Sequence, residues 1–349
     1  MAILVDVSTG QTLFAREADR RFMPASITKA MTALTAFEMI EQGRLFPRQI
    51  YTVRPETFRQ WQQVGSTMFL PADAQVSVDD LLRGITTVSA NDASVVLAEG
   101  AAGSVAEWTA AMNAAARTIG MTDSHFNTPN GWMDEGRTFT TARDLAALGT
   151  ALAVRHPAKY RRYFGASEFT YNGITQPNHD PIIGVVPGAD GIKTGFTNQA
   201  GYGFLGSAQR GSRRLVMVIA GAPSARSRNR AARDLVEWGF AEFAYRRLFE
   251  AGEQVGNARV QGGSVRHVGL VSKGPVRLSL PKDGPADVEL AIRYSGPLIA
   301  PIAAGEQVAS LVVTMNGQEV ADHPLYAEVS VGRTWLLGRA INGVLGWFS

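Results

Sequence analysis

Short apolar runs in two distant parts of the chain predict the strands of one sheet. They cover residues 2–6, 12–16, 190–195, 202–208 and 215–220. Turn-forming residues separate the first two runs and also the last two, as in β-hairpins. The early hairpin and the three later strands are expected to join into a single antiparallel sheet.

Apolar residues spaced three and four apart, together with helix-capping residues, predict helices between and after these strands. Ser77 with Asp80 and Ser104 with Glu107 match the capping-box pattern that opens a helix. The expected helices cover residues 26–43, a segment beginning at 78, and residues 104–120, 141–154 and 228–247. Residues 44–76 contain three prolines and are predicted to be a loop-rich flank.

The pattern changes after residue 250, where short alternating runs punctuated by Gly and Pro predict a small all-β domain. The final residues place their apolar side chains on one half of a helical wheel, as in a helix that lies on a membrane surface. A helix docked on its own β-domain or on another subunit is the alternative. We therefore expect domains at 1–249 and 250–331, followed by an amphipathic helix at 332–349.

Composition narrows the class of protein. The 349 residues carry a net charge of +3, with no run of Lys and Arg interleaved with aromatics, so nucleic-acid binding is not expected. The chain has no cysteine, which excludes disulfides and thiol catalysis. No apolar run of membrane-spanning length occurs. The N-terminus lacks the features of a signal peptide, so the protein is cytoplasmic or its export signal has been removed.

Ser26 and Lys29 form the candidate catalytic pair. Side chains three residues apart lie on one face of a helix, so the Lys29 amine can approach the Ser26 hydroxyl. A serine needs a neighbouring base to become a nucleophile, and a lysine can be that base when burial lowers its pKa. Only five of the 34 basic residues are lysines. Because Arg cannot give up its proton, lysines kept in such a chain are candidates for chemistry.

Two further motifs follow in order, Ser89-Ala90-Asn91 between helices and Lys193-Thr194-Gly195 on a strand. Each motif is weak alone, and Ser-x-x-Lys also occurs at Ser279–Lys282, where Pro281 and a strand context exclude a helical pair. The ordered set, each member in a suitable local structure, is the specific signal.

With these motifs the chain resembles the low-molecular-weight penicillin-binding proteins, specifically the D-alanyl-D-alanine carboxypeptidases. The resembling segments are Pro24–Lys29, Asn91–Ala93, Phe169–Gly173 and Asp190–Gly195. The resemblance implies an α+β fold: a β-lactamase/transpeptidase-like domain, with an antiparallel sheet flanked by helices plus a helical subdomain, then a small all-β domain and a C-terminal amphipathic helix.

The resemblance also implies acyl transfer with no cofactor. Ser26 would attack the carbonyl between two D-alanines, Lys29 would act as base, Ser89 would relay a proton to the leaving amine, and Asn91 would hold the substrate amide and Lys29. The histidines show no metal-ligand spacing, and His179, in the loop before the third motif, is a candidate to line the cleft.

The remaining residues implied by the resemblance bind substrate. Lys193 and Thr194, followed by Gly195, would meet the terminal carboxylate, and backbone N–H groups at Ser26 and near Phe196 would form the oxyanion hole. Several relatives have His where this chain has Phe196, so turnover or substrate preference is expected to differ. Arg228 is expected to pair with the carboxylate, the alternative being a solvated arginine.

The implied partners are peptidoglycan stem peptides that end in D-Ala-D-Ala, β-lactams as covalent inhibitors, and a membrane surface. The implied location is periplasmic or extracytoplasmic, peripheral on the outer face of the cytoplasmic membrane. The alternatives are a DD-endopeptidase, a non-catalytic cell-wall scaffold, and a β-lactamase. The β-lactamase would use Glu168 for deacylation, but Glu168 lies only 25 residues before Lys193.

Overall fold

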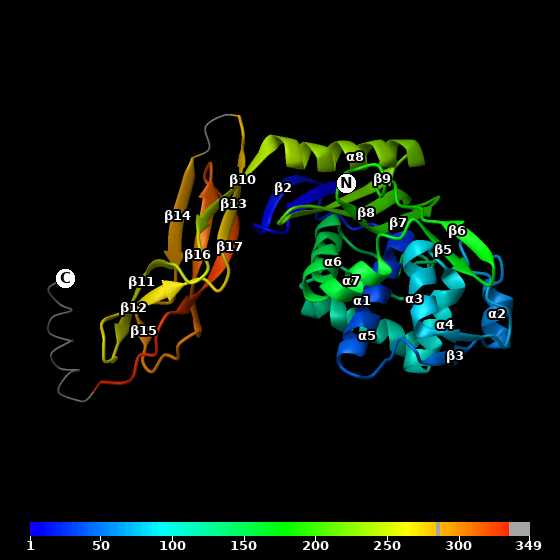
Figure 1. The fold of residues 1–349 in the computed structure, drawn as a ribbon, viewed down its shortest axis with the longest axis horizontal. Coiled ribbons are helices and arrows are strands. Elements are labelled where there is room, and N and C mark those ends of the chain that lie inside the picture. The colour runs from blue at the N-terminus through cyan, green and yellow to red at the C-terminus, as the bar shows by residue number, and fades with distance from the viewer. Residues whose placement is uncertain (284–286, 335–349) are drawn as a thin grey trace. The chain divides into compact units, whose positions relative to one another are not determined.

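In the computed structural model, which describes residues 1–283 and 287–334, a five-stranded sheet runs through the first part of the chain (Figure 1). Its strand order is β2-β1-β9-β8-β7, and the pairs β1–β9, β9–β8 and β8–β7 are antiparallel. The strands are β1 (Ala2–Asp6), β2 (Gln11–Arg16), β7 (Ala189–Thr197), β8 (Gly201–Arg210) and β9 (Arg213–Ala222). The predicted sheet is confirmed.

Alternating side chains give this sheet two apolar faces. Leu4 and Leu215 belong to the cluster beneath helix α8 (Ala225–Glu242), whereas Ile3 and Val216 belong to the larger cluster on the other face. Glycines allow close packing: a Cβ on Gly239 of α8 would lie 2.5 Å from the Leu4 side chain. Figure 1 accordingly shows α8 on one face of the sheet and the remaining helices on the other.

Helix α1 (Thr28–Glu41) lies at the centre of the larger cluster, which explains its lack of a polar face. Met31, Leu34 and Phe37 are fully buried. A 3₁₀ turn, η1 (Ala25–Ile27), precedes it, so Ser26 lies in this turn and not in the predicted α-helix. The helices around α1 are α2 (Pro55–Trp61), α3 (Val78–Thr87), α4 (Asn91–Ala102), α5 (Val105–Thr118), α6 (Ala142–Arg155) and α7 (Pro157–Tyr163).

The capping predictions are confirmed, because the Ser77 and Ser104 side chains accept hydrogen bonds from the backbone N–H groups of Asp80 and Glu107. Several short elements were not predicted. They are β3 (Ile50–Thr52), β4 (Gln75–Ser77), β5 (Glu168–Tyr171) and β6 (Ile174–Pro177), together with α2 and α7. These pieces are too short for a periodic pattern and depend on pairing with each other or on packing. The longer helix α4 was also not predicted, because Asn91–Ala98 are all buried and give no amphipathic spacing.

The predicted helix 228–247 is wrong at its C-terminal end, because α8 stops at Glu242 and Phe243–Phe249 forms strand β10. Strand β10 pairs antiparallel with β13, and this tertiary pairing overrides the local helical spacing. The chain correspondingly forms two compact units, Met1–Val7 with Thr12–Ala241, and Ser8–Gln11 with the residues from Glu242 onward.

The second unit is all-β, as predicted. A six-stranded sheet has the order β14-β16-β17-β12-β11-β15, and its core includes the fully buried Leu270 and Leu325. The strands are β11 (Gln254–Gln261), β12 (His267–Val271), β13 (Val276–Pro281), β14 (Val288–Arg293), β15 (Leu298–Ile299), β16 (Gln307–Met315) and β17 (Gln318–Ala327). The amphipathic helix expected at 332–349 lies, from residue 335, outside the described residues.

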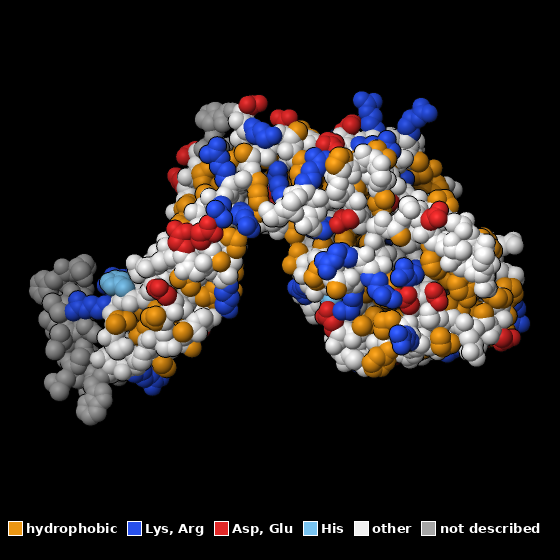
Figure 2. Space-filling model, in the orientation of Figure 1, with side chains coloured by type: hydrophobic (Ala, Val, Ile, Leu, Met, Phe, Trp, Pro, Cys, Tyr) orange, Lys and Arg blue, Asp and Glu red, His pale blue; other side chains and the backbone are white. Residues whose placement is uncertain are grey.

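The α+β fold prediction is confirmed, and none of the helices in the described residues is long and apolar enough to cross a membrane. On the face of the first unit seen in Figure 2, acidic and basic side chains are interspersed, and basic side chains stand out over α8. Arg226 and Arg230 of α8 are exposed.

Asp92, in the first turn of α4, fixes the neighbouring loop. It is buried, and its carboxylate accepts backbone hydrogen bonds from Met68 (3.1 Å), Leu70 (3.1 Å) and Ala93 (2.9 Å). Negative charge is favourable at a helix N-terminus. The carboxylate thus ties residues 64–70 to the start of α4, where Asn91 lies.

Replacing Asp92 with Ala should lower the free energy of unfolding by about 3 kcal/mol, because buried N–H groups lose their acceptor. Chemical denaturation checks this value. Asp234→Ala is the control, since Asp234 is exposed and its 3.4 Å pair with Arg230 should contribute under about 1 kcal/mol. Equal effects of the two substitutions would contradict the role given to Asp92.

Candidate active site

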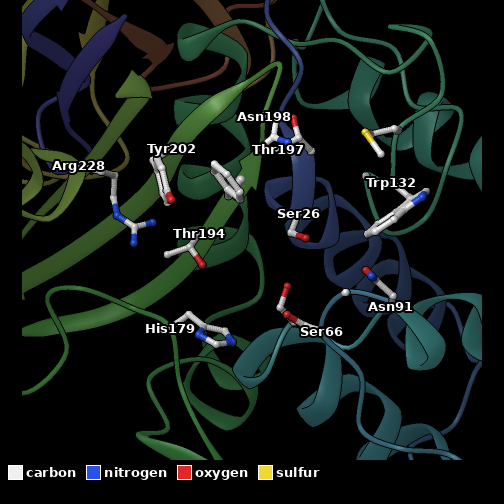
Figure 3. Close-up of a pocket in the computed structure, with 16 residues that line it drawn as sticks. Ser26, Ser66, Asn91, Trp132, His179, Thr194, Thr197, Asn198, Tyr202 and Arg228 are labelled. Atoms are coloured by element: carbon white, nitrogen blue, oxygen red, sulfur yellow. The ribbon is translucent and has the colours of Figure 1, made fainter. Parts of the chain in front are cut away.

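A cavity of about 500 Å³ opens where η1, the start of α4 and strand β7 meet (Figure 3). Most of the residues predicted for the site line it, namely Ser26, Ser89, Asn91, Thr194, Gly195, Phe196 and Arg228. The other two, Lys29 and Lys193, lie in the wall with 0% and 3% of their surface exposed. The structure therefore brings all three sequence motifs together.

The Lys29 amine has three hydrogen-bond partners. Its Nζ lies 2.9 Å from Ser26 Oγ, 2.7 Å from Asn91 Oδ1 and 2.8 Å from the backbone oxygen of Asn130. The last two are carbonyl oxygens, which only accept hydrogen bonds. A neutral amine has two N–H bonds for these carbonyls, and its lone pair then points at the Ser26 hydroxyl. The arrangement fits Lys29 as a base acting on Ser26.

Burial lowers the pKa of Lys29 well below its usual value. The positive charge of Lys193 lowers this pKa further, while the carboxylate of Asp92 opposes both effects. A buried amine without a directly paired carboxylate favours the neutral form. The electrostatics and the hydrogen-bond geometry therefore agree on a neutral Lys29.

A tight turn places the Asn130 carbonyl against Lys29. The turn is closed by a 3.0 Å hydrogen bond from the Gly131 N–H to Thr128 Oγ1. Gly131 has φ +72°, and a Cβ at this position would lie 1.9 Å from the Ala25 oxygen. Only glycine fits such a close approach. No sequence motif indicated that a backbone oxygen would meet Lys29.

Ser89 and Asn91 lie at the junction of α3 and α4. Ser89 has φ +64°, a left-handed conformation uncommon outside glycine, and it faces the cavity. The Asn91 side chain accepts from Lys29 and donates its Nδ2 to the Val64 oxygen at 2.9 Å. This second bond fixes the orientation of the amide.

Strand β7 carries the third motif along one wall of the cavity. Lys193 Nζ donates to the Thr194 backbone oxygen at 3.2 Å. Burial lowers the pKa of Lys193 to about 7; the charge of Asp180 raises this pKa and that of Arg228 lowers it. A Cβ on Gly195 would lie 2.5 Å from the Pro24 oxygen, so glycine lets β7 pack directly on η1 beside Ser26.

Arg228 is only 7% exposed, so the alternative of a solvated arginine is wrong. Its Nη1 donates to the Gly203 backbone oxygen at 3.0 Å, and its Nε donates to Asn229 Oδ1 at 2.7 Å. Figure 3 shows its guanidinium directed into the cavity on the same side as Thr194. A positively charged corner of the cavity results.

Several lining residues were not predicted, notably Tyr202, Trp132 and Ser66. Phe196 stacks on Tyr202 with ring centroids 4.1 Å apart, and Trp132 packs edge-on against Trp61 at 5.9 Å. Tyr202, Trp132 and Ser66 belong to none of the three motifs, so only the folded structure identifies them as part of the site. His179 lines the cavity, as the sequence suggested.

Acidic side chains are absent from the described residues that line the cavity. Glu168, the residue considered for a β-lactamase, is exposed on β5 and is not among them. Within residues 1–283 and 287–334, no cluster of three His, Cys, Asp or Glu side chains could hold a metal ion.

A serine with a buried lysine base, beside a cationic corner in an α+β fold, defines a serine-type acyl-transfer enzyme. Sequence comparison gives the particular family. The D-alanyl-D-alanine carboxypeptidase family, Peptidase_S11, matches residues 1–224, and the C-terminal domain of penicillin-binding protein 5 matches residues 243–333. The chain belongs to the D-alanyl-D-alanine carboxypeptidase family.

The relatives cover nearly the whole chain. D-alanyl-D-alanine carboxypeptidase DacD of Escherichia coli is 34% identical over 97% of this chain and 88% of its own length. DacA of Haemophilus influenzae is 32% identical, over 97% and 86%. The crystal structure of penicillin binding protein 5 from Haemophilus influenzae superposes with a TM-score of 0.84 at 32% identity, covering 95% of this chain and 97% of that one.

The protonation states of the two buried lysines can be measured directly. Labelling at lysine ¹³Cε should give five NMR signals, because the chain has five lysines. We expect the Lys193 signal to titrate near pH 7, and the Lys29 signal far below the value of about 10.4 typical of a free lysine. Lys29→Ala and Lys193→Ala assign the two signals. An ordinary lysine titration at position 29 would contradict its role as a base.

Proposed function

We propose that this protein is a serine D-Ala-D-Ala carboxypeptidase that removes the terminal D-alanine from peptidoglycan stem peptides. The observation that carries the proposal is the Lys29 amine, held by two carbonyl oxygens and directed at Ser26 Oγ. Membership of the family named for this activity supports the choice of substrate.

In the first step Ser26 Oγ attacks the carbonyl carbon of the bond between the two D-alanines, and Lys29 takes the hydroxyl proton. Negative charge develops on the carbonyl oxygen, and the backbone N–H groups of Ser26 and Phe196 stabilise it. The C–N bond then breaks. Ser89 relays a proton to the leaving nitrogen, and free D-alanine departs.

In the second step a water molecule attacks the acyl group on Ser26. Lys29 takes a proton from this water and returns it to Ser26 Oγ as the ester bond breaks, which regenerates the hydroxyl and the neutral amine. Asn91 holds the Lys29 amine in both steps, and it has an amide that can also meet the substrate backbone.

The cationic corner selects the free carboxylate of the terminal D-alanine. Thr194 provides a hydroxyl donor, Lys193 provides charge from the cavity wall, and Arg228 provides a guanidinium suited to a carboxylate. Gly195 lets β7 pack closely on η1, which brings the strand that would bind the substrate beside Ser26. Phe196 is 47% exposed, and with Tyr202 it offers an apolar surface to the substrate.

β-Lactams should acylate Ser26 by the same attack on a carbonyl. Penicillin-binding protein D2 from Listeria monocytogenes, 29% identical over 68% of this chain, has been solved with bound ampicillin, which supports this part of the proposal. The amine that a β-lactam releases stays tethered to the acyl group, whereas D-alanine departs and leaves space for water. The described lining also offers no carboxylate that could activate water from another side, so the adduct should persist, unlike that of a β-lactamase. A DD-endopeptidase would use the same residues. A scaffold would have no use for a buried lysine.

We place the protein outside the cytoplasm, in the periplasm, where peptidoglycan and cell shape are maintained. Residues 332–349 would attach it to the outer face of the cytoplasmic membrane. The support is the sequence pattern, in which Leu336, Ile341 and Trp347 share the apolar half of a helical wheel.

Incubation with benzylpenicillin should add the mass of one drug molecule to the protein and leave it there. Ser26→Ala should show no adduct, because it lacks the attacking oxygen. Intact-mass spectrometry, with release of D-alanine from a D-Ala-D-Ala peptide measured in parallel, tests both parts of the proposal. Rapid loss of drug without a lasting adduct would identify a β-lactamase instead, and no adduct at all would favour the scaffold.

Truncation after residue 331 should abolish cosedimentation with vesicles of anionic phospholipid and leave peptidase activity unchanged. The apolar side chains that the sequence pattern places on one half of a helical wheel would supply the membrane affinity. A milder change in the full chain, Trp347→Ser, should weaken vesicle binding only partly, because the other apolar side chains remain. Undiminished binding of the truncated protein would place membrane attachment elsewhere.

A further inference from the structure

Asp180 is a partly buried acidic residue that the proposed mechanism does not use. It lies in the loop between β6 and β7, directly after His179 of the cavity wall. Its Oδ1 accepts hydrogen bonds from the backbone N–H groups of Ile182 (2.8 Å) and Ile183 (3.1 Å). Its Oδ2 is buried and has no hydrogen-bond partner among the described residues.

Capping the loop does not require a carboxylate. An asparagine could accept the same two hydrogen bonds through its Oδ1. A buried charged oxygen without a hydrogen bond is costly, and that cost is tolerated where a nearby opposite charge offsets it. The structure of the loop alone therefore does not explain why residue 180 is an aspartate.

Positive charges on two other elements act on Asp180. Lys193 of β7 and Arg228 of α8 both lower its pKa, although burial dominates and raises it to about 6. His179 is on the same loop, and Arg233 of α8 donates to the neighbouring Pro181 oxygen at 3.1 Å. In return, the Asp180 charge is the influence that raises the pKa of Lys193, against burial and Arg228.

The charge on Lys193 also affects the proposed catalytic pair, Ser26 and Lys29. A protonated Lys193 lowers the pKa of Lys29, so charge on Lys193 favours the neutral amine that faces Ser26. Burial alone drives Lys193 towards its neutral form. A neutral Lys193 would both weaken the cationic corner and remove this influence on Lys29.

We propose that Asp180 is a positioning residue, whose free carboxylate oxygen keeps Lys193 cationic and thereby maintains both carboxylate binding and the neutral Lys29. This inference rests on the proposed function. Lys193 loses its proton as the pH rises through about 7, so activity should fall on that alkaline side. Removing the Asp180 charge lowers the pKa of Lys193 and moves this fall to lower pH.

The test compares wild type with Asp180→Asn, which keeps the loop-capping acceptor. The Lys193 ¹³Cε signal should titrate at lower pH in the variant. At pH 7.5, kcat/KM for a D-Ala-D-Ala peptide should fall by about tenfold, mainly through KM. It should largely recover at pH 6, where a larger fraction of Lys193 is protonated. Asp144→Asn is the matched control, since Asp144 is buried and also capping, with Oδ2 2.9 Å from the Asp123 nitrogen.

Asp144→Asn should change neither the Lys193 titration nor the pH profile. An unchanged Lys193 titration in Asp180→Asn, with only a lower melting temperature, would reduce Asp180 to a loop cap and overturn the inference. The NMR titration needs no substrate. Failure of wild type to cleave the peptide would therefore refute the proposed function, while the titration would still decide whether Asp180 controls Lys193.

Discussion

The hydrogen bonds of one buried amine govern the architecture of this site. Lys29 can be neutral and directed at Ser26 only while two carbonyl oxygens, of Asn91 and Asn130, occupy its N–H bonds. These oxygens come from the start of α4 and from a turn closed at Gly131, far apart in sequence. Burying α1 on all sides against the other helices and the sheet brings them together. The large core thus both stabilises the fold and sets the chemistry of the amine.

The rest of the site depends on a separation of charges. Acidic groups are excluded from the described cavity lining, and positive charge is concentrated on Lys193 and Arg228. Burial, and after it the positive charge of Lys193, favours the neutral form of Lys29. In the proposed function the same positive charge would also attract the carboxylate of the substrate. Concentrating positive charge in this way has an energetic cost, because Lys193 and Arg228 lose much of their hydration. The Asp180 carboxylate, behind the cavity wall, offsets part of that cost without facing the substrate.

Local sequence patterns predicted the central sheet and most of the long helices, whereas the grouping of the three motifs in one site followed from the family resemblance. The spacing of Ser26 and Lys29 and the capping residue Ser77 are such local patterns. Contacts set by tertiary structure escaped prediction. The Asn130 backbone oxygen has no side-chain signature, and Tyr202 enters the cavity only because β8 pairs with β7. Strand β10 replaced the end of a predicted helix for the same reason, since its partner β13 lies some thirty residues away.

The structure explains why lysine is used at position 29 in a chain that otherwise prefers arginine. One buried arginine shows a cation that has only to stay charged: Arg213 pairs with the fully buried Asp6 at 2.7 Å. Lys29, in contrast, is buried without a hydrogen-bonded carboxylate and has a lowered pKa. An arginine at position 29 would remain charged and could not accept the proton of Ser26. The presence of lysine at position 29, in a chain that otherwise prefers arginine, therefore follows from the need for a base that can exist in its neutral form.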